Sequence, residues 1–218
     1  AGAAFNASLA TGPLGGRTYF DALALKEIGY DAITLGNHDF DFGPDVLADF
    51  ISYYDSQGGS ATFVSSNLDF SGETSLQNLV ASGDIARSVK VTRGSETYGI
   101  IGATTTDLDI VSNPGNVIAN PVLAAIQGEV SALQADGVNK IILSSHLQNL
   151  GNELALVSQL NGVDVVIAGG GDELLINTDN ARNTVAEATG PYPRVVQDAD
   201  GKNVAVVTTV GEYFYVGE

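Results

Sequence analysis

Hydrophobic residues recur at helical spacing in four segments of the chain. These segments are residues 17–28, a run that begins at Gly43-Pro44-Asp45, residues 121–136 and residues 152–160. In the second segment Pro44 can take the first helical position and Asp45 the first turn, where proline and an acidic side chain are both favourable. The spacing therefore predicts four helices.

Short, continuously apolar runs lie between these segments and predict strands. They cover residues 31–35, 62–66, 140–144 and 164–168. Because these runs do not alternate with polar residues and helices separate them, they are typical of a sheet that is covered on both faces. With 218 residues, of which 44% are hydrophobic, the chain can fill a sizeable core. We therefore predict an α/β fold in a single domain over residues 1–218.

The remaining apolar runs predict antiparallel strands at the margins of this sheet. Residues 85–92 and 98–103 flank the turn-like stretch Arg93-Gly94-Ser95 and indicate a hairpin. Further strands are predicted near the end of the chain, at residues 194–197, 203–209 and 212–216. The polar stretch 177–190 is predicted to be a long surface loop or, equally, an insertion near a site.

The composition of the chain limits which molecules it can bind and which metal ligands it can offer. Nine Lys+Arg against 26 Asp+Glu give a net charge of -17, which repels nucleic acid and anionic membranes. No cysteine is present, so any metal ion must be bound by oxygen and imidazole ligands. The longest apolar runs are far shorter than the roughly 20 residues of a membrane span, so membrane insertion is not expected. The acidic surface fits a periplasmic or extracellular protein.

Polar clusters follow three of the predicted strands. They are Gly36-Asn37-His38-Asp39, Ser145-His146 and the run Gly169-Gly170-Gly171-Asp172-Glu173. In open α/β sheets, ligands bind outside the carboxyl ends of the strands. If these strands are parallel neighbours, the clusters converge on one edge and bring both histidines of the chain together. Alternatively, either histidine only caps a neighbouring element.

Several acidic residues and glycines of the chain have a possible structural role as well as a possible functional one. Asp39 or Asp41 could cap the helix that begins near Gly43-Pro44, although Asp41 is also close enough to His38 to bond an imidazole nitrogen. The three glycines at 169–171 are a weak candidate for a phosphate loop. The stretch Asp198-Ala199-Asp200-Gly201 is half of a calcium loop, but a hairpin turn explains it better.

The stretch Gly36-Asn37-His38-Asp39-Phe40-Asp41 resembles the Gly-Asn-His-Asp/Glu signature of calcineurin-like metallophosphoesterases. Residues 30–43 resemble the 5′-nucleotidase branch of that family in particular. The resemblance continues in the family's order through residues 66–68, 102–106, 143–146 and 164–173. It covers most of the chain and implies the family's layered sheets with flanking helices, incomplete at the N-terminus.

The resemblance also implies a reaction. Asn37 and His146 would be ligands of a centre of two divalent metal ions, which could be Mn²⁺, Zn²⁺, Ca²⁺ or Mg²⁺. His38, oriented by Asp41, would stabilise or protonate the leaving oxygen of a phosphate monoester. The substrate would be a small phosphorylated molecule such as a nucleotide, and the cations would offset its repulsion by an acidic protein.

This sequence departs from the family pattern in two places. The family's Gly-His-x-His motif is replaced around Gly171, so that Glu173 falls on the second ligand position, and Asp172 could reach inward instead if the loop is shifted. Carboxylates there would favour hard cations. The family's opening Asp-x-His strand and Gly-Asp element should lie upstream of Ala1, and its substrate domain downstream. We therefore expect a longer polypeptide whose remainder completes the site.

Two hypotheses about function follow. The first is a secreted or periplasmic phosphoesterase that hydrolyses nucleotides or related monoesters by attack of a metal-activated water. The second is a non-catalytic binding or structural domain that kept the fold and lost its metal ligands, which Gly171 in place of a histidine favours. Metal content would distinguish the two hypotheses, because only the first requires a stoichiometric metal.

Overall fold

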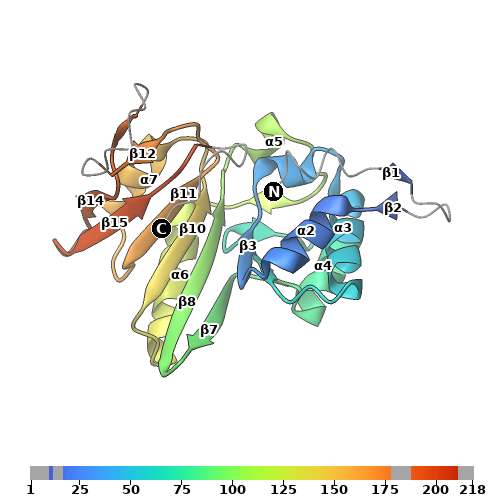
Figure 1. Ribbon diagram of the computed structural model, residues 1–218, viewed down its shortest axis with the longest axis horizontal. Helices are drawn as coiled ribbons and strands as arrows, with labels where there is room; N and C mark the ends of the chain where they lie inside the picture. Colours follow the sequence, from blue (N-terminus) through green and yellow to red (C-terminus); the bar gives the residue numbers. More distant parts are fainter. Residues whose placement is uncertain (1–9, 12–16, 178–187, 211–218) are drawn as a thin grey trace.

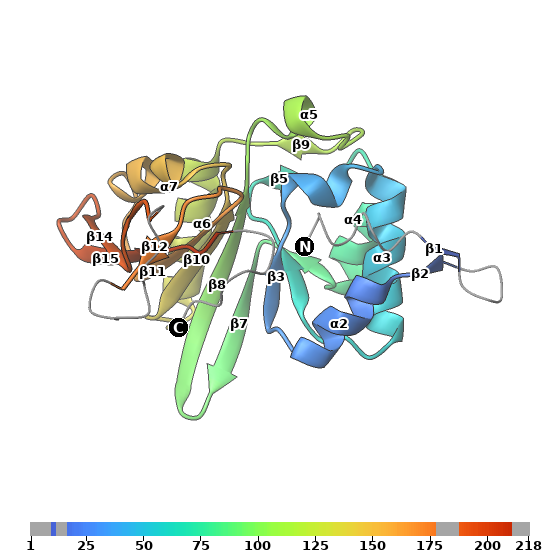
Figure 2. The ribbon, with the colours of Figure 1, turned by 45° about the horizontal axis from the view of Figure 1, so that its top comes forward.

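The computed structural model describes residues 10–11, 17–177 and 188–210. A six-stranded sheet and a three-stranded sheet lie against each other, and each carries helices on its outer side (Figure 1). The order of layers is therefore helix, sheet, sheet, helix, as Figure 2 shows from a second direction. This confirms the α/β class and the layered sheets with flanking helices that the resemblance implied, and the covered sheet read from the apolar runs is divided into two sheets that cover each other.

The larger sheet has the strand order β14-β15-β11-β10-β8-β7. In chain order its strands are β7 Ser88–Arg93, β8 Glu96–Thr104, β10 Ile141–His146, β11 Val165–Gly169, β14 Arg194–Gln197 and β15 Asn203–Val207. Strands β8, β10, β11 and β15 are parallel, while β7 and β14 pair antiparallel with their neighbours at the two edges. The antiparallel margins predicted from the sequence are thus confirmed.

One face of this sheet packs against two helices, α6 Val122–Ala135 and α7 Leu150–Val157. Both helices were predicted, with boundaries that differ by one to three residues. Their apolar faces meet the inward residues of β8, β10, β11 and β15 in a core of aliphatic side chains. Burial of this apolar surface is the main force that holds the layer together.

The smaller sheet is parallel and has the order β3-β4-β6. Its strands are β3 Ala32–Thr34, β4 Thr62–Val64 and β6 Ile85–Ala86. The helices α2 Phe20–Ile28, α3 Pro44–Ser56 and α4 Thr74–Ser82 pack against it around a core that is rich in aromatic rings. As predicted, α3 begins with Pro44 in its first turn.

Three details differ from the sequence prediction. Helix α2 begins three residues late, because Arg17–Thr18 is a short strand, β2, that pairs with β1, Ala10–Thr11. Helix α4 was not predicted, since its short sequence carries only a few apolar residues. The run 85–92 is not one strand: it splits at Arg87 into β6 and β7, which belong to different sheets.

Short elements complete the described chain. They are the 3-10 helix η1 Asn37–Phe40, the helix α5 Leu108–Val111, the strand pair β5 Leu68–Asp69 with β9 Ile118–Ala119, and the parallel pair β12 Leu175–Ile176 with β13 Gly190–Pro191. The acidic stretch at 198–201 is the hairpin turn that we favoured, because Asp198 Oδ1 accepts bonds from the backbone N–H groups of Asp200 and Lys202. Most of the predicted loop 177–190 and the strand 212–216 lie outside the described residues.

The two sheets touch through backbone at the carboxyl end of β4. The backbone N–H of Ser66 donates to the carbonyl oxygen of Gly102 on β8 at 2.8 Å. A Cβ at position 102 would lie 2.2 Å from the carbonyl oxygen of Val64, which no side chain could tolerate. Glycine at this position therefore permits the close approach of the two sheets.

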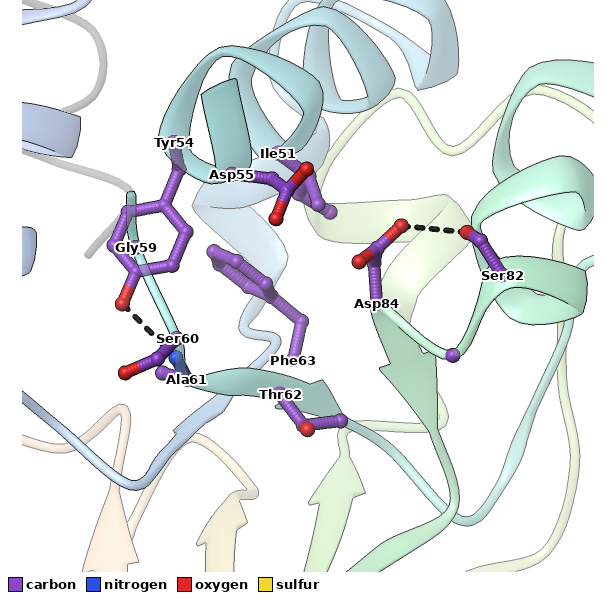
Figure 3. A pocket seen from close by; sticks show the side chains of 11 residues that line it. Ile51, Tyr54, Asp55, Gly59, Ser60, Ala61, Thr62, Phe63, Ser82 and Asp84 are labelled. Carbon is purple, nitrogen blue, oxygen red and sulfur yellow. Dashed lines mark hydrogen bonds between the residues drawn. The ribbon is translucent and has the colours of Figure 1, made fainter. Parts of the chain in front are cut away.

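A cavity of about 200 Å³ lies at the opposite, amino end of β4 (Figure 3). Tyr54 of α3 and Phe63 of β4 form part of its wall, with their rings in edge-to-face contact at a centroid distance of 5.6 Å. The polar groups of Asp55, Ser60 and Asp84 also line it. Because it opens away from the carboxyl ends of the strands, this cavity is separate from the polar clusters that the sequence singled out.

Candidate active site

Asn37 is the first residue of η1, the turn that follows β3. The side chain of Asp39 stabilises this turn, because its Oδ2 accepts a 2.7 Å bond from the backbone N–H of Gly36. Asn37 and Asp39 are both buried, with 5% and 4% of their surface exposed, and burial raises the pKa of Asp39. The Gly-Asn-His-Asp stretch thus forms a compact, internally bonded turn that presents Asn37 to the interior.

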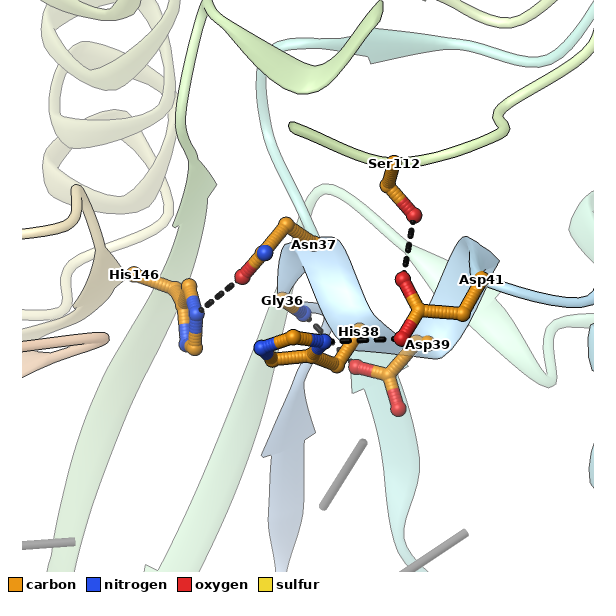
Figure 4. A network of polar contacts seen from close by, with 7 residues as sticks. All are labelled: Gly36, Asn37, His38, Asp39, Asp41, Ser112 and His146. Carbon is orange, nitrogen blue, oxygen red and sulfur yellow. Dashed lines mark hydrogen bonds and ion pairs between the residues drawn. The ribbon is translucent and has the colours of Figure 1, made fainter. Parts of the chain in front are cut away.

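Asn37 meets His146, the last residue of β10. Nε2 of His146 lies 2.8 Å from Oδ1 of Asn37, across 109 positions of sequence (Figure 4). The two residues come from different sheets, so they meet across the sheet-sheet junction and not along one sheet edge. The sequence expectation was correct about the meeting and wrong about the three strands being neighbours: only β10 and β11 are parallel neighbours.

Two glycines make room for the imidazole ring of His146. A Cβ on Gly36 would lie 2.7 Å from ring atoms of His146, and a Cβ on Gly170 would lie 2.7 Å from its Cδ2. Gly170 also has a φ of 86°, in the left-handed region that favours glycine. The glycines that precede Asn37 and follow β11 therefore leave the space that the ring occupies.

His146 is neutral at ordinary pH in this position. Burial, with a smaller contribution from the charge of His38, lowers the pKa of His146 to about 4. A neutral imidazole keeps one unprotonated nitrogen, which is the form that binds a metal ion.

His38 and Asp41 form a pair beside this contact. Nδ1 of His38 lies 2.8 Å from Oδ2 of Asp41, and the hydroxyl of Ser112 donates to Oδ1 of Asp41 at 2.8 Å. In Figure 4 the His38 ring lies between Asp41 and His146. The side chain of His38 is 53% exposed, whereas that of Asp41 is 24% exposed. The pair can therefore meet a molecule that approaches from solvent.

The structure gives Asp39 and Asp41 contacts other than the capping of α3. Helix α3 begins at Gly43 without a side-chain cap, so neither Asp39 nor Asp41 caps it. Asp41 instead binds His38 and Ser112, which is the geometry that a tautomer-fixing carboxylate requires. Ser112 follows α5, and no pattern in the sequence pointed to it.

A buried polar network lies beneath the site. The side chain of Asn67 donates to the carbonyl oxygen of Thr104 and accepts from the N–H of Thr104, both at 2.8 Å. The hydroxyl of Thr104 donates to the carbonyl oxygen of Leu35, and the N–H of Thr105 donates to the carbonyl oxygen of His146. This network ties the chain before Asn37 to the backbone of His146.

The predicted carboxylate ligands are placed differently. Glu173 accepts a 3.0 Å bond from the backbone N–H of Leu150, at the first turn of α7, and Asp172 is exposed. The structure does not bring either carboxylate to Asn37, so their role as ligands stays a prediction. Within the ranges that the structure describes, no three His, Asp or Glu side chains gather closely enough to hold one ion.

Comparison with known proteins identifies relatives over most of the chain. The 5′-nucleotidase of Mus musculus is 32% identical over 191 residues, which are 87% of this chain and 31% of that protein. The apyrase of Anopheles gambiae is 29% identical over 90% of this chain and 34% of its own length. The chain thus spans about one third of the length of these relatives. No family model matches it.

Solved structures of such proteins share the fold. The 5′-nucleotidase precursor of Thermus thermophilus superposes with a TM-score of 0.75 and 39% identity, over 86% of this chain and 34% of that one. The calcineurin-like phosphoesterase YfkN of Bacillus subtilis, at 19% identity and a TM-score of 0.61, shares the fold over 89% of this chain and 58% of its own. In the part of the chain described here, no helix combines the length and apolar character that crossing a membrane requires. By sequence and by fold, the chain belongs to the 5′-nucleotidase family.

Proposed function

We propose that the protein that carries this chain hydrolyses the phosphate monoester of a nucleotide in a reaction that depends on divalent metal ions. The observation that carries the proposal is the 2.8 Å contact between Asn37 and His146, with the His38–Asp41 pair one residue along the chain. Family membership supports the same chemistry, because the relatives include proteins named 5′-nucleotidase, apyrase and NAD nucleotidase.

The donor atoms at the junction suit a cation. An amide oxygen and a neutral imidazole nitrogen are both common ligands, and they lie 2.8 Å apart. Asn37 and His146 would hold a cation between them, and the proton that Nε2 carries in its present bond to the amide oxygen would then move to Nδ1. Bound cations would supply positive charge that holds the phosphate and favours ionisation of water.

His38 would act on the leaving oxygen of the substrate. Asp41 engages Nδ1 of His38, so the other ring nitrogen, Nε2, is left to face the substrate. A histidine held in this way can donate a proton to the departing alkoxide. Because half of the His38 side chain is exposed, the ring can reach a substrate without displacing the buried residues.

A complete centre would need further ligands besides Asn37 and His146. Asn37 and His146 are two donors, and a two-cation site needs several more. Asp172 and Glu173 remain candidates, since a shift of the loop after β11 would bring Asp172 inward or release Glu173 from α7. We also propose that other parts of the polypeptide contribute ligands and the surface that recognises the nucleotide.

The charge of the chain supports a cation-dependent reaction and a location outside the cytoplasm. A net charge of -17 repels a phosphate ester unless bound cations offset it locally. The acidic composition is consistent with a periplasmic or extracellular protein, and two of the relatives are named snake venom 5′-nucleotidases.

Phosphate release from AMP tests the proposal. The protein that carries this chain is stripped of metal, and turnover is measured before and after addition of Mn²⁺, Mg²⁺, Ca²⁺ or Zn²⁺. We expect turnover only with metal, and a loss of at least about 100-fold in His146→Ala. Absence of turnover with every metal, for AMP and for p-nitrophenyl phosphate alike, would reject the proposal. Metal analysis of the same samples then shows whether the domain binds cations without catalysis.

A further inference from the structure

We infer that Glu153 is a positioning residue that holds the end of β10 so that His146 faces Asn37. Glu153 lies on α7, seven positions after His146, and nothing in its helical sequence context sets it apart from an ordinary surface acid. In the structure it is fully buried, with 0% of its surface exposed. The inference rests on the proposed role of His146 as a cation ligand.

The carboxylate of Glu153 forms hydrogen bonds to both neighbours of His146, the side chain of the residue before it and the backbone of the residue after it. Its Oε1 accepts a 2.9 Å bond from the hydroxyl of Ser145 and a 3.3 Å bond from the backbone N–H of Leu147. One oxygen atom therefore restrains the residue before His146 and the residue after it. Since successive side chains of a strand point to opposite faces, fixing Ser145 inward directs His146 to the other face, toward the smaller sheet.

The chain after His146 needs this restraint because it turns sharply. Gln148 has a φ of 77°, the one left-handed non-glycine residue in the described part of the chain. Such a backbone is strained and persists only where the surroundings hold it. A second side chain from α7 helps: Asn152 donates to the carbonyl oxygen of Leu147 at 2.6 Å. Helix α7 thus fixes the turn that carries His146 with two polar side chains.

Glu153 is a poor choice for packing alone. Its second carboxyl oxygen, Oε2, is buried and has no hydrogen-bond partner among the described residues. A leucine in this place would avoid that cost, whereas the two bonds to Oε1 require an acceptor. Burial raises the pKa of Glu153 to about 7, so the acid is often neutral near physiological pH. Glu153→Gln should therefore preserve this role, since the side-chain amide of glutamine is neutral and keeps an oxygen that accepts both bonds.

Mn²⁺ binding to the metal-free protein tests this inference without relying on activity. The dissociation constant is measured by titration calorimetry, well below the unfolding temperature, for the wild type and for Glu153→Ala, Glu153→Gln and Ser145→Ala. Loss of a residue that orients a ligand typically weakens metal binding about 10–100-fold. We expect that loss in Glu153→Ala, a smaller loss in Ser145→Ala, and affinity close to wild type in Glu153→Gln.

Leu156→Ala is the matched control. Leu156 lies on the same helix, is buried, and belongs to the core beneath the larger sheet. This variant should lower the unfolding temperature and leave Mn²⁺ affinity unchanged, which separates positioning from general stability. Unchanged affinity in Glu153→Ala overturns the inference, as does an equal loss in Glu153→Gln or in Leu156→Ala. If Glu153→Ala does not fold, unchanged affinity in Ser145→Ala decides against it.

The two proposals fail in distinguishable ways. A wild-type protein that binds no Mn²⁺ contradicts the proposed metal centre, and with it the role of Glu153. A wild type that binds Mn²⁺ as tightly as Glu153→Ala leaves the proposed function standing and contradicts only the role of Glu153.

Discussion

The hydroxyl of Thr104 donates a 2.8 Å hydrogen bond to the backbone carbonyl oxygen of Leu35. Thr104 ends β8 in the larger sheet, and Leu35 follows β3 in the smaller sheet. Two residues beyond Leu35 lies Asn37, and the next residue after Thr104 bonds the backbone of His146. This bond therefore helps to set the distance between the two proposed metal ligands.

Replacement of Thr104 by valine should weaken both the fold and the site. Valine keeps the shape but leaves the carbonyl oxygen of Leu35 and the hydroxyl of Ser65 without this partner. A buried group left unsatisfied costs about 1–3 kcal/mol, so we expect the free energy of unfolding to fall by about 2 kcal/mol or more in urea titrations. Thr92→Val is the control, because Thr92 is exposed on β7 and its bond to Thr97 faces solvent. Equal losses in the two variants would contradict this account.

His38 and Asp41 should affect turnover more than metal binding. Removal of a general acid typically lowers kcat by about 10²–10⁴-fold, so we expect such a loss in His38→Ala and a smaller one in Asp41→Asn. Mn²⁺ affinity should change little in either variant, because neither residue is a proposed ligand. Steady-state hydrolysis of AMP measures the first effect and calorimetry the second.

The control for this pair is Asp109→Asn. Asp109 is an exposed acid on the neighbouring helix α5, and it tests whether loss of any nearby negative charge changes the rate. If Asp109→Asn lowers kcat as much as Asp41→Asn, a general electrostatic effect explains the loss better than the bond to His38.

Gly36→Ala should displace His146. The added methyl group would lie 2.7 Å from the imidazole ring, so the ring or the turn must move. Misplacement by about 1 Å can cost about 10²-fold in rate, and we expect a loss of that order in AMP hydrolysis. Gly128→Ala is the opposite case: it lies within α6, where the methyl group meets nothing within 4 Å. That variant should stabilise the protein by about 0.5–1 kcal/mol and keep its activity.

The stability of the protein should depend on pH through Glu153. Its pKa is raised from 4.5 to about 7, so the folded state binds the proton more tightly than the unfolded state does. The free energy of unfolding therefore falls as pH rises from about 4.5 to about 7, by an amount on the order of 3 kcal/mol. His146, whose pKa is lowered to about 4, acts in the opposite direction between about 4 and 6.5. Wild type alone therefore does not isolate the effect of Glu153.

Glu153→Gln isolates it, because glutamine does not titrate. Relative to wild type, this variant should gain stability between about pH 4.5 and pH 7 and level off above pH 7, as measured by urea unfolding at several pH values. A difference between the two proteins that stays constant over this range would show that Glu153 does not change its protonation there.

The sequence predicted the elements better than their assembly. The Gly43-Pro44 start of α3 and the apolar strands β10 and β11 depend on local signals, which short-range chemistry determines. The division into two sheets depends on contacts far apart in the chain, such as the approach of Gly102 to Val64. The break at Arg87, which sends β6 and β7 to different sheets, has no local signal either.

The site shows the same division. A short motif and the positions after strands predict Asn37, His38, Asp41 and His146 as site residues, and the structure places them near one another, while their roles stay predictions. Ser112 and Glu153 were missed because each looks like an ordinary polar residue of a helix or loop. Such residues matter because of the side chains they contact. Ser112 contacts Asp41, which lies 71 positions earlier in the chain, and a single sequence does not show which distant residues come together.

Each sheet of this protein carries its own hydrophobic core, and the proposed ligands stand one on each. A ligand gripped by Asn37 and His146 at once would bind only while both halves are docked, and so its binding energy would oppose their separation as well as their unfolding. With the ligand bound, the two sheets and their helices would therefore unfold in one cooperative transition. Without the ligand, each sheet with its helices would unfold at its own temperature.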